Sequence, residues 1–195
     1  MAPPVYFVRH GETAWNAELR LQGQADTEMT ARGRRQALRN GRRLAELIGD
    51  AAGFDFVASP LRRTRETMEL VRTAMQLPAS AYRLEPLLLE VHFGDWQGFT
   101  LDEIEARTPG STAARALDKW GFLPPGAGAE SYDMLLRRVR PWFEGLTSPT
   151  VAVTHGGVMR AMFRMAAGMP AGEAAVLEIW QDRVLRVEGP KLEWL

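Results

Sequence analysis

Short apolar runs alternate with amphipathic stretches along the chain. Three runs, at 5–8, 54–58 and 150–154, are rich in β-branched and aromatic residues and predict buried strands. Between them, hydrophobic residues recur at helical spacing over 30–48 and 62–75, which predicts two amphipathic helices. Because strands alternate with helices, the pattern predicts an α/β fold with a mostly parallel sheet covered on both faces.

The second half of the chain is less regular. Between 86 and 98 the pattern is ambiguous, whereas 100–119 predicts short helices broken at Pro109 and Gly110. Three later elements are expected: a capped helix from Ser131 to about Phe143, a helix over 158–167, and a closing hairpin formed by 176–180 with 184–187.

Composition limits the class of protein. The chain has 195 residues, of which 46% are hydrophobic, so one compact domain spanning 1–195 is expected. Lys+Arg and Asp+Glu are both 24, and this balance gives no general sign of binding to nucleic acid or a membrane. Cysteine is absent, which excludes a disulfide scaffold and a thiolate nucleophile. With no signal-like or membrane-spanning run, the sequence predicts a soluble, cytoplasmic protein.

Two segments share one local form, an apolar strand followed by His-Gly. His10 ends the first strand and His155 ends the run at 150–154. Ligands of parallel sheets bind outside the carboxyl ends of the strands. If the two strands are neighbours, about 4.8 Å apart, both imidazoles can contact one phosphoryl group. A helix that starts at Gly156 and Gly157 would add free N–H donors for the anion.

The residue types at this edge suit phosphoryl transfer. The reaction needs positive charge on the phosphoryl oxygens, a nucleophile and a proton for the leaving oxygen. Arg9 and Arg62 suit the first task, and a neutral His10 suits the second. Glu90 is the leading candidate for the acid. Each residue alone has an ordinary structural explanation, and only the joint arrangement favours chemistry.

The run from Arg9 to Asn16, RHGETAWN, resembles the signature of the histidine phosphatase superfamily, the phosphoglycerate mutase-like group. Further segments match that family in order along nearly the whole chain: Gln22-Gly23 with Asp26, Thr30, Gly33, Gln36 and Ala37; Ser59 to Arg62; Glu90 to Gly98; Glu130-Ser131; and His155 to Gly157 with Arg160. Glu28-Met29, Gln97 and the loop 125–130 depart from the usual pattern, which puts substrate identity in doubt more than the chemistry.

The resemblance implies a role for each matched residue. His10 would be the phosphorylated nucleophile, and Glu90 the proton donor and then the base. The phosphate pocket would comprise Arg9, Arg62 and His155, with secondary contacts from Asn16, Gln22, Gly23 and the Gly156 amide. It also implies a three-layer αβα sandwich, a lid at about 86–130, and no metal or other cofactor.

The expected function is that of a phosphomonoesterase that hydrolyses small phosphorylated metabolites and releases inorganic phosphate. One alternative is a mutase that returns the phosphoryl group to its substrate, although the run 88–98 resembles the phosphatase branch. A second is a metal hydrolase with ligands from His10, His92, His155 and Glu90. A third is a non-catalytic module that binds phosphorylated ligands. The sequence leaves the substrate and the oligomeric state open.

Overall fold

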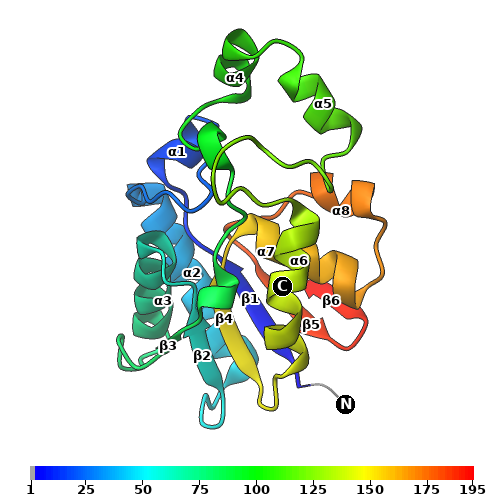
Figure 1. The fold of residues 1–195 in the computed structure, drawn as a ribbon. Helices are drawn as coiled ribbons and strands as arrows, with labels where there is room; N and C mark the ends of the chain where they lie inside the picture. The colour runs from blue at the N-terminus through cyan, green and yellow to red at the C-terminus, as the bar shows by residue number, and fades with distance from the viewer. Residues whose placement is uncertain (1–2) are drawn as a thin grey trace.

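The computed structural model describes residues 3–195 and contains a six-stranded sheet between two layers of helices (Figure 1). The order of the strands is β3-β2-β4-β1-β5-β6. The strands from β3 to β1 in this order are parallel to one another. β5 is antiparallel to both of its neighbours, β1 and β6. Their bounds are β1 Val5–Arg9, β2 Asp55–Ala58, β3 Arg83–Leu84, β4 Thr150–Thr154, β5 Val184–Glu188 and β6 Lys191–Trp194. The α/β fold with a mostly parallel sheet is therefore confirmed.

Alternate side chains of the central strands enter two separate cores. On one face, Tyr6 and Val8 of β1 pack with the helices α2 (Ala31–Ile48) and α3 (Arg62–Ala74). On the other face, Val5 and Phe7 pack in a larger core with residues of three helices. These are α6 (Tyr132–Glu144), α7 (Gly156–Ala166) and α8 (Ala171–Val176). Because successive side chains of a strand point to opposite faces, one fully buried strand serves both layers of the αβα sandwich.

Side-chain caps fix where two of the long helices begin. The hydroxyl of Thr30 accepts a hydrogen bond from the Gly33 amide at 3.0 Å at the start of α2. Ser131 does the same for Met134 at the start of α6, at 3.2 Å. Such caps satisfy N–H groups that have no partner within the helix. Both predicted helix starts are confirmed.

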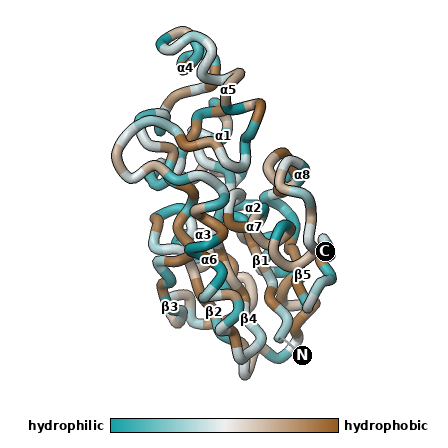
Figure 2. The backbone as a smooth tube through the Cα atoms, turned by 45° about the vertical axis from the view of Figure 1, so that its right-hand side comes forward, coloured by the Kyte–Doolittle hydropathy of each residue, from teal (hydrophilic) through white to brown (hydrophobic). Residues whose placement is uncertain are grey.

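The segment between β3 and α6 lies beyond the carboxyl edge of the sheet. It contains two short 3-10 helices at Pro86–Leu88 and Gly94–Trp96, then α4 (Leu101–Arg107) and α5 (Ser111–Leu117). Figures 1 and 2 show α4 and α5 at the upper end of the molecule, apart from the sheet and near the short helix α1 (Ala14–Ala17). The sequence correctly predicted short helices here.

The prediction of a hairpin between 176–180 and 184–187 is wrong. The closing hairpin is formed by β5 and β6 across the turn at Gly189, whose φ is +56°. The segment after α8 is not a strand, because its carbonyl groups bind arginine side chains instead of a neighbouring strand. The carbonyl of Ile179 accepts from Arg9 Nη1 at 2.7 Å, and that of Leu177 accepts from Arg160 Nε at 3.0 Å.

Candidate functional site

The register of β1 and β4 brings the two histidines together. The strands are parallel neighbours in which Arg9 is paired with Thr154, so the following residues, His10 and His155, also lie side by side. The amide of His10 donates to the carbonyl of Thr154 at 3.0 Å. The two imidazole rings have centroids 5.2 Å apart and are inclined at 60°. The juxtaposition expected from the repeated strand-His-Gly form is thus present.

A cavity of about 210 Å³ opens next to His10 at the carboxyl edge of the sheet. Its wall combines the ends of the strands, the loop after α1, the N-terminus of α7 and the segment that contains α5. Most of the charged residues in the wall are cationic. The lining comprises Arg9, His10, Asn16, Arg20, Leu21, Gln22, Gly23, Arg63, Glu90, Phe93, Arg115, Lys119, Tyr132, Gly156 and Arg160.

The surroundings of His10 select the form needed for nucleophilic attack. Nδ1 lies 2.9 Å from the carbonyl oxygen of Gly11. That oxygen can only accept a hydrogen bond, so Nδ1 carries the hydrogen and Nε2 keeps its lone pair. Burial, and next the positive charges of Arg63 and Arg9, hold the pKa of His10 well below its usual value. The ring is therefore neutral at pH 7 and can donate an electron pair.

The structure does not bring Arg62 to this cavity. Its side chain is 61% exposed and pairs with Glu28 at 3.1 Å on the outside of the molecule. The cavity is lined instead by the next residue, Arg63, whose side chain is fully buried. One residue turns a helix by about 100°, so Arg62 and Arg63 at the start of α3 point in different directions. Arg63, and not the predicted Arg62, therefore lies at the cavity.

A sequence signal for Arg63 existed in the helical pattern. Arg63 lies four residues before Thr67 and eight before Val71, both of which are buried along the inward side of α3. Arg63 Nη2 donates to the carbonyl of Gly23 at 2.7 Å, and Nη1 contacts Asp26 at 3.1 Å. These contacts fix the guanidinium next to the histidines. Extending the inward face of the helix back to its first turn would have identified it.

His155 is fully buried, and it lies behind the cavity wall rather than in its lining. Its Nε2 is 2.8 Å from Ser59 Oγ, and its Nδ1 is 3.4 Å from Arg63 Nη2. Because the guanidinium can only donate, Nδ1 is the acceptor and Nε2 carries the hydrogen. Burial, followed by Arg63 and His10, lowers the pKa of His155 well below its usual value. The ring thus aligns Arg63 and packs against His10.

Glu90 lies in the cavity wall, where backbone amides hold its carboxyl group. Oε2 accepts from the Gly157 amide in the first turn of α7 at 3.0 Å, and Oε1 accepts from the Val91 amide at 2.9 Å. A Cβ at position 157 would displace Glu90 Oε1, so glycine allows the carboxyl group to take this position. The carboxyl group is therefore held at the N-terminus of α7, which faces the cavity.

Arg138 of α6 secures the segment that carries Glu90, a role that the sequence did not indicate. Its guanidinium donates to the carbonyl oxygens of Leu87 at 2.7 Å and Leu89 at 3.1 Å. It also binds both carboxyl oxygens of Glu130 at 2.8 Å. A segment without long regular structure is thereby held by one bidentate ion pair and several backbone contacts.

Arg9 lies at the end of β1 with part of its guanidinium unpartnered. Nη1 binds the Ile179 carbonyl, whereas the buried Nε has no hydrogen-bond partner within residues 3–195. Burial, and then the charge of Arg160, lowers the pKa of Arg9 to about 10. Buried Nε of Arg63 is likewise unpartnered in the described part of the chain. Unpaired buried donors of this kind are costly, and an anion would satisfy them.

The expected secondary contacts also line the cavity: Asn16, Gln22, Gly23 and Gly156. Gly23 has a φ of +56°, a conformation that favours glycine, and its carbonyl receives Arg63. Gln181 belongs to no sequence pattern that indicated a role. Its side-chain amide donates to the carbonyl of His10 at 3.0 Å and to Asn16 Oδ1 at 3.1 Å. It thus links the backbone of His10 to one of the cavity residues.

The proposed metal ligands do not converge. Within residues 3–195, no group of three histidine, aspartate or glutamate side chains is arranged to hold a metal ion. His92 is outside the cavity lining, and its Nδ1 accepts from the Gly94 amide at 2.9 Å.

No helix within residues 3–195 has the length and hydropathy needed to cross a membrane.

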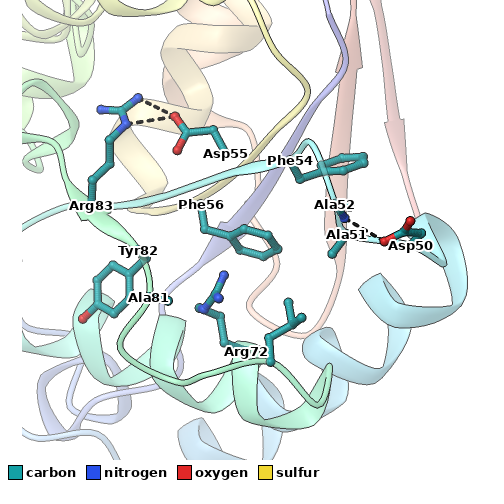
Figure 3. A pocket seen from close by; sticks show the side chains of 11 residues that line it. Asp50, Ala51, Ala52, Phe54, Asp55, Phe56, Arg72, Ala81, Tyr82 and Arg83 are labelled. Carbon is teal, nitrogen blue, oxygen red and sulfur yellow. Dashed lines mark hydrogen bonds and ion pairs between the residues drawn. The ribbon is translucent and has the colours of Figure 1, made fainter.

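A larger cavity of about 600 Å³ lies elsewhere, along β2 and β3 (Figure 3). Figure 3 shows the Arg72 side chain pointing toward the Phe56 ring, 4.3 Å from its centroid, and Arg83 paired with Asp55. Neither histidine nor glutamate lines this cavity. The chemistry is therefore assigned to the smaller cavity at the carboxyl edge, which His10 and Glu90 line.

Comparison with known proteins places this geometry in context. Residues 5–190 match the histidine phosphatase superfamily (branch 1). The chain is 32% identical over 182 residues to a glucosyl-3-phosphoglycerate phosphatase of Mycolicibacterium vanbaalenii, covering 87% of this chain and 76% of that protein. It is 31% identical to a probable phosphoglycerate mutase GpmB of Erwinia tasmaniensis, covering 98% and 87%.

A solved structure shows the same arrangement of the chain. It is that of a mycobacterial glucosyl-3-phosphoglycerate phosphatase complexed with VO3. The TM-score is 0.80 at 28% identity, and the match covers 100% of this chain and 97% of the other. The similarity therefore extends over the whole fold, including the segment that carries α4 and α5.

Proposed function

The chain belongs to the histidine phosphatase superfamily, branch 1, and we propose that it hydrolyses phosphate monoesters of small metabolites through a phosphohistidine at His10. The observation that carries the proposal is the contact that orients the ring of His10. Its Nδ1 is bound to the Gly11 carbonyl, so a neutral Nε2 remains for attack in a cavity rich in cations. The named relatives, which include phosphatases, support the same reaction class.

The first half of the reaction transfers the phosphoryl group. His10 Nε2 forms a bond to phosphorus as the bond from phosphorus to the ester oxygen breaks. Glu90 in its acid form gives its proton to that oxygen, and the alcohol leaves. Arg9 and Arg63 balance the charge on the phosphoryl oxygens, with Gly156 at the N-terminus of α7 adding an amide.

The second half regenerates the enzyme. Glu90, now a carboxylate, takes a proton from water, and the water oxygen attacks phosphorus as the bond to Nε2 breaks. Inorganic phosphate leaves, and both His10 and Glu90 return to their starting forms. The same carboxyl group serves both steps because Gly157 and Val91 keep it in the cavity wall.

A mutase is the second candidate, because one relative is named a probable phosphoglycerate mutase. Both activities use phosphohistidine and differ in what accepts the phosphoryl group. We place this chain with the phosphatases because its run 88–98 resembles that branch. Hydrolysis of each phosphohistidine to inorganic phosphate is the expected outcome.

One assay separates the candidates. The protein is supplied with p-nitrophenyl phosphate and with 3-phosphoglycerate, and both inorganic phosphate and 2-phosphoglycerate are measured. We expect phosphate release from at least one ester and no interconversion of the phosphoglycerates. Vanadate should inhibit, and EDTA should leave the rate unchanged. Interconversion without phosphate release would establish a mutase, and loss of activity with EDTA that zinc restores would establish a metal hydrolase.

A further inference from the structure

The cavity has a second cationic end that the phosphoryl chemistry does not use. Arg115 and Lys119, from α5 and the residues after it, line the same cavity as His10. Arg160 of α7 lies in the wall with them. Both Arg115 and Lys119 are half-buried.

These three cations lack the carboxylate partners that Arg20 and Arg63 of the same cavity have. Arg20, in the same lining, is paired with Glu18 at 2.7 Å and Glu103 at 2.6 Å. Within residues 3–195, no carboxylate is within ion-pair distance of Arg115, Lys119 or Arg160. Arg160 instead donates to the Leu177 carbonyl and to the Tyr132 hydroxyl, the latter at 3.5 Å.

The charges of these side chains also act on one another. Burial, and then the charges of Arg160 and Arg115, lowers the pKa of Lys119 to about 8. Burial and Arg160 also lower the pKa of Arg115. Arg160 acts in turn on Arg9 at the phosphoryl end. Cationic side chains therefore line the cavity from His10 to the segment carrying α5. An anion bound between these side chains would relieve the repulsion between their charges.

We propose that Arg115, Lys119 and Arg160 form a second anion subsite, so that the preferred substrate is a small phosphate ester carrying a further anionic group, such as a carboxylate. This inference rests on the proposed function, because it places the ester phosphate beside His10. The cavity of about 210 Å³ is smaller than the range of about 300–1,000 Å³ typical of drug-sized ligands, which favours a compact substrate.

The test uses two phosphate esters that differ only in the group farthest from the phosphate. 3-Phosphoglycerate carries a carboxylate where glycerol 3-phosphate carries a hydroxymethyl group. A charge-assisted hydrogen bond is worth about 1.5–3 kcal/mol, which corresponds to about 10- to 100-fold in affinity. We expect kcat/KM for 3-phosphoglycerate to exceed that for glycerol 3-phosphate by at least about 10-fold. Equal values for the two esters would overturn the subsite.

Substitutions then test whether Arg115 and Lys119 cause the preference for 3-phosphoglycerate. Arg115→Gln together with Lys119→Gln should lower kcat/KM for 3-phosphoglycerate by about 10²-fold or more, mainly through KM, and change that for p-nitrophenyl phosphate by less than about threefold. The matched control is Arg137→Gln, which removes an exposed cation of α6, 67% exposed and outside the cavity. Equal losses with both substrates would show that the cations act on the phosphoryl group or the fold, and not on a second anion.

Binding measurements separate this inference from the proposed function. Calorimetric titration of the wild-type protein with glycerol 3-phosphate and 3-phosphoglycerate at 4 °C reports affinity, and turnover of p-nitrophenyl phosphate reports the reaction. Turnover with equal affinity for the two esters would refute the second anion subsite alone. Selective affinity for 3-phosphoglycerate, lost in the double variant, without turnover of any ester would support the subsite and refute the phosphatase.

Discussion

The two ends of the cavity are built from different parts of the fold. At the histidine end, His10 and Arg63 are buried and anchored by backbone groups at the sheet edge. At the far end, Arg115 and Lys119 come from the segment between β3 and α6, half-buried and without carboxylate partners in the described chain. The difference indicates that one end is organised for a fixed reaction and the other for recognition that can vary.

His10→Ala, at the histidine end of the cavity, should have the largest effect on activity. Loss of the nucleophile should reduce phosphate release by at least about 10⁴-fold, since a nucleophile accounts for most of the rate enhancement of covalent catalysis. His92→Ala is a matched control, because His92 lies outside the cavity lining. It should retain at least about a tenth of the activity. Comparable loss in the two variants would place the chemistry elsewhere.

Glu90→Gln should produce the next largest effect, and one that depends on the leaving group. An alkyl alkoxide needs a proton in order to leave, whereas p-nitrophenolate does not. Phosphorylation of His10 by alkyl esters should slow by about 10²–10⁴-fold, and by p-nitrophenyl phosphate far less. The second step should slow as well, giving a burst of p-nitrophenol in rapid-mixing experiments. Equal losses and no burst would remove Glu90 from the acid role.

The neighbouring arginines at the start of α3 provide a paired test of the histidine end. Arg63→Met should lower kcat/KM for every ester by about 10²–10³-fold, because it removes a fixed charge from the phosphoryl site. Arg62→Met should change it by less than about threefold, since Arg62 is exposed and paired with Glu28. Thermal unfolding of both variants shows whether the loss is one of stability. The reverse order of effects would restore Arg62 to the pocket.

The far end should respond to pH in a way that the histidine end does not. Lys119, with a pKa of about 8, is charged below that pH and neutral above it. The preference for 3-phosphoglycerate over glycerol 3-phosphate should therefore fall by about 10-fold between pH 7 and pH 9. Lys119→Arg, which stays charged, should keep the preference constant. The other charged and titratable residues of the cavity are Arg9, His10, Arg20, Arg63, Glu90, Arg115, Tyr132 and Arg160.

The sequence predicted the histidine end better than the far end. The runs ending at His10 and His155 are continuous and apolar, which is typical of central parallel strands. Their adjacency was only a condition of the sequence argument, and the structure shows that they are neighbours. The choice of Arg62 over Arg63 failed because a helix start was identified without following its inward face into the first turn. The hairpin was misplaced because the carbonyls of 177–179 bind Arg9 and Arg160, a long-range contact that no local pattern records.

The segment that forms the far end could be predicted only as short helices. Its position depends on contacts between distant parts of the chain, such as those of Arg138 with the carbonyls of Leu87 and Leu89. Arg115 and Lys119 belong to no recognisable sequence motif. Only their position in the wall of the cavity that His10 also lines indicates a role for them. Periodicity cannot supply that placement, because it describes each element separately.

The central claim is that the phosphoryl group passes through His10, and trapping the intermediate tests it most directly. Wild-type protein is mixed with a labelled ester, quenched in alkali during turnover, digested and sequenced by mass spectrometry. We expect an alkali-stable, acid-labile phosphate on Nε2 of His10, absent from His10→Ala and increased in Glu90→Gln. Phosphate recovered on His155, Ser59 or Glu90, or turnover at the full rate with no phosphorylated protein, would contradict it.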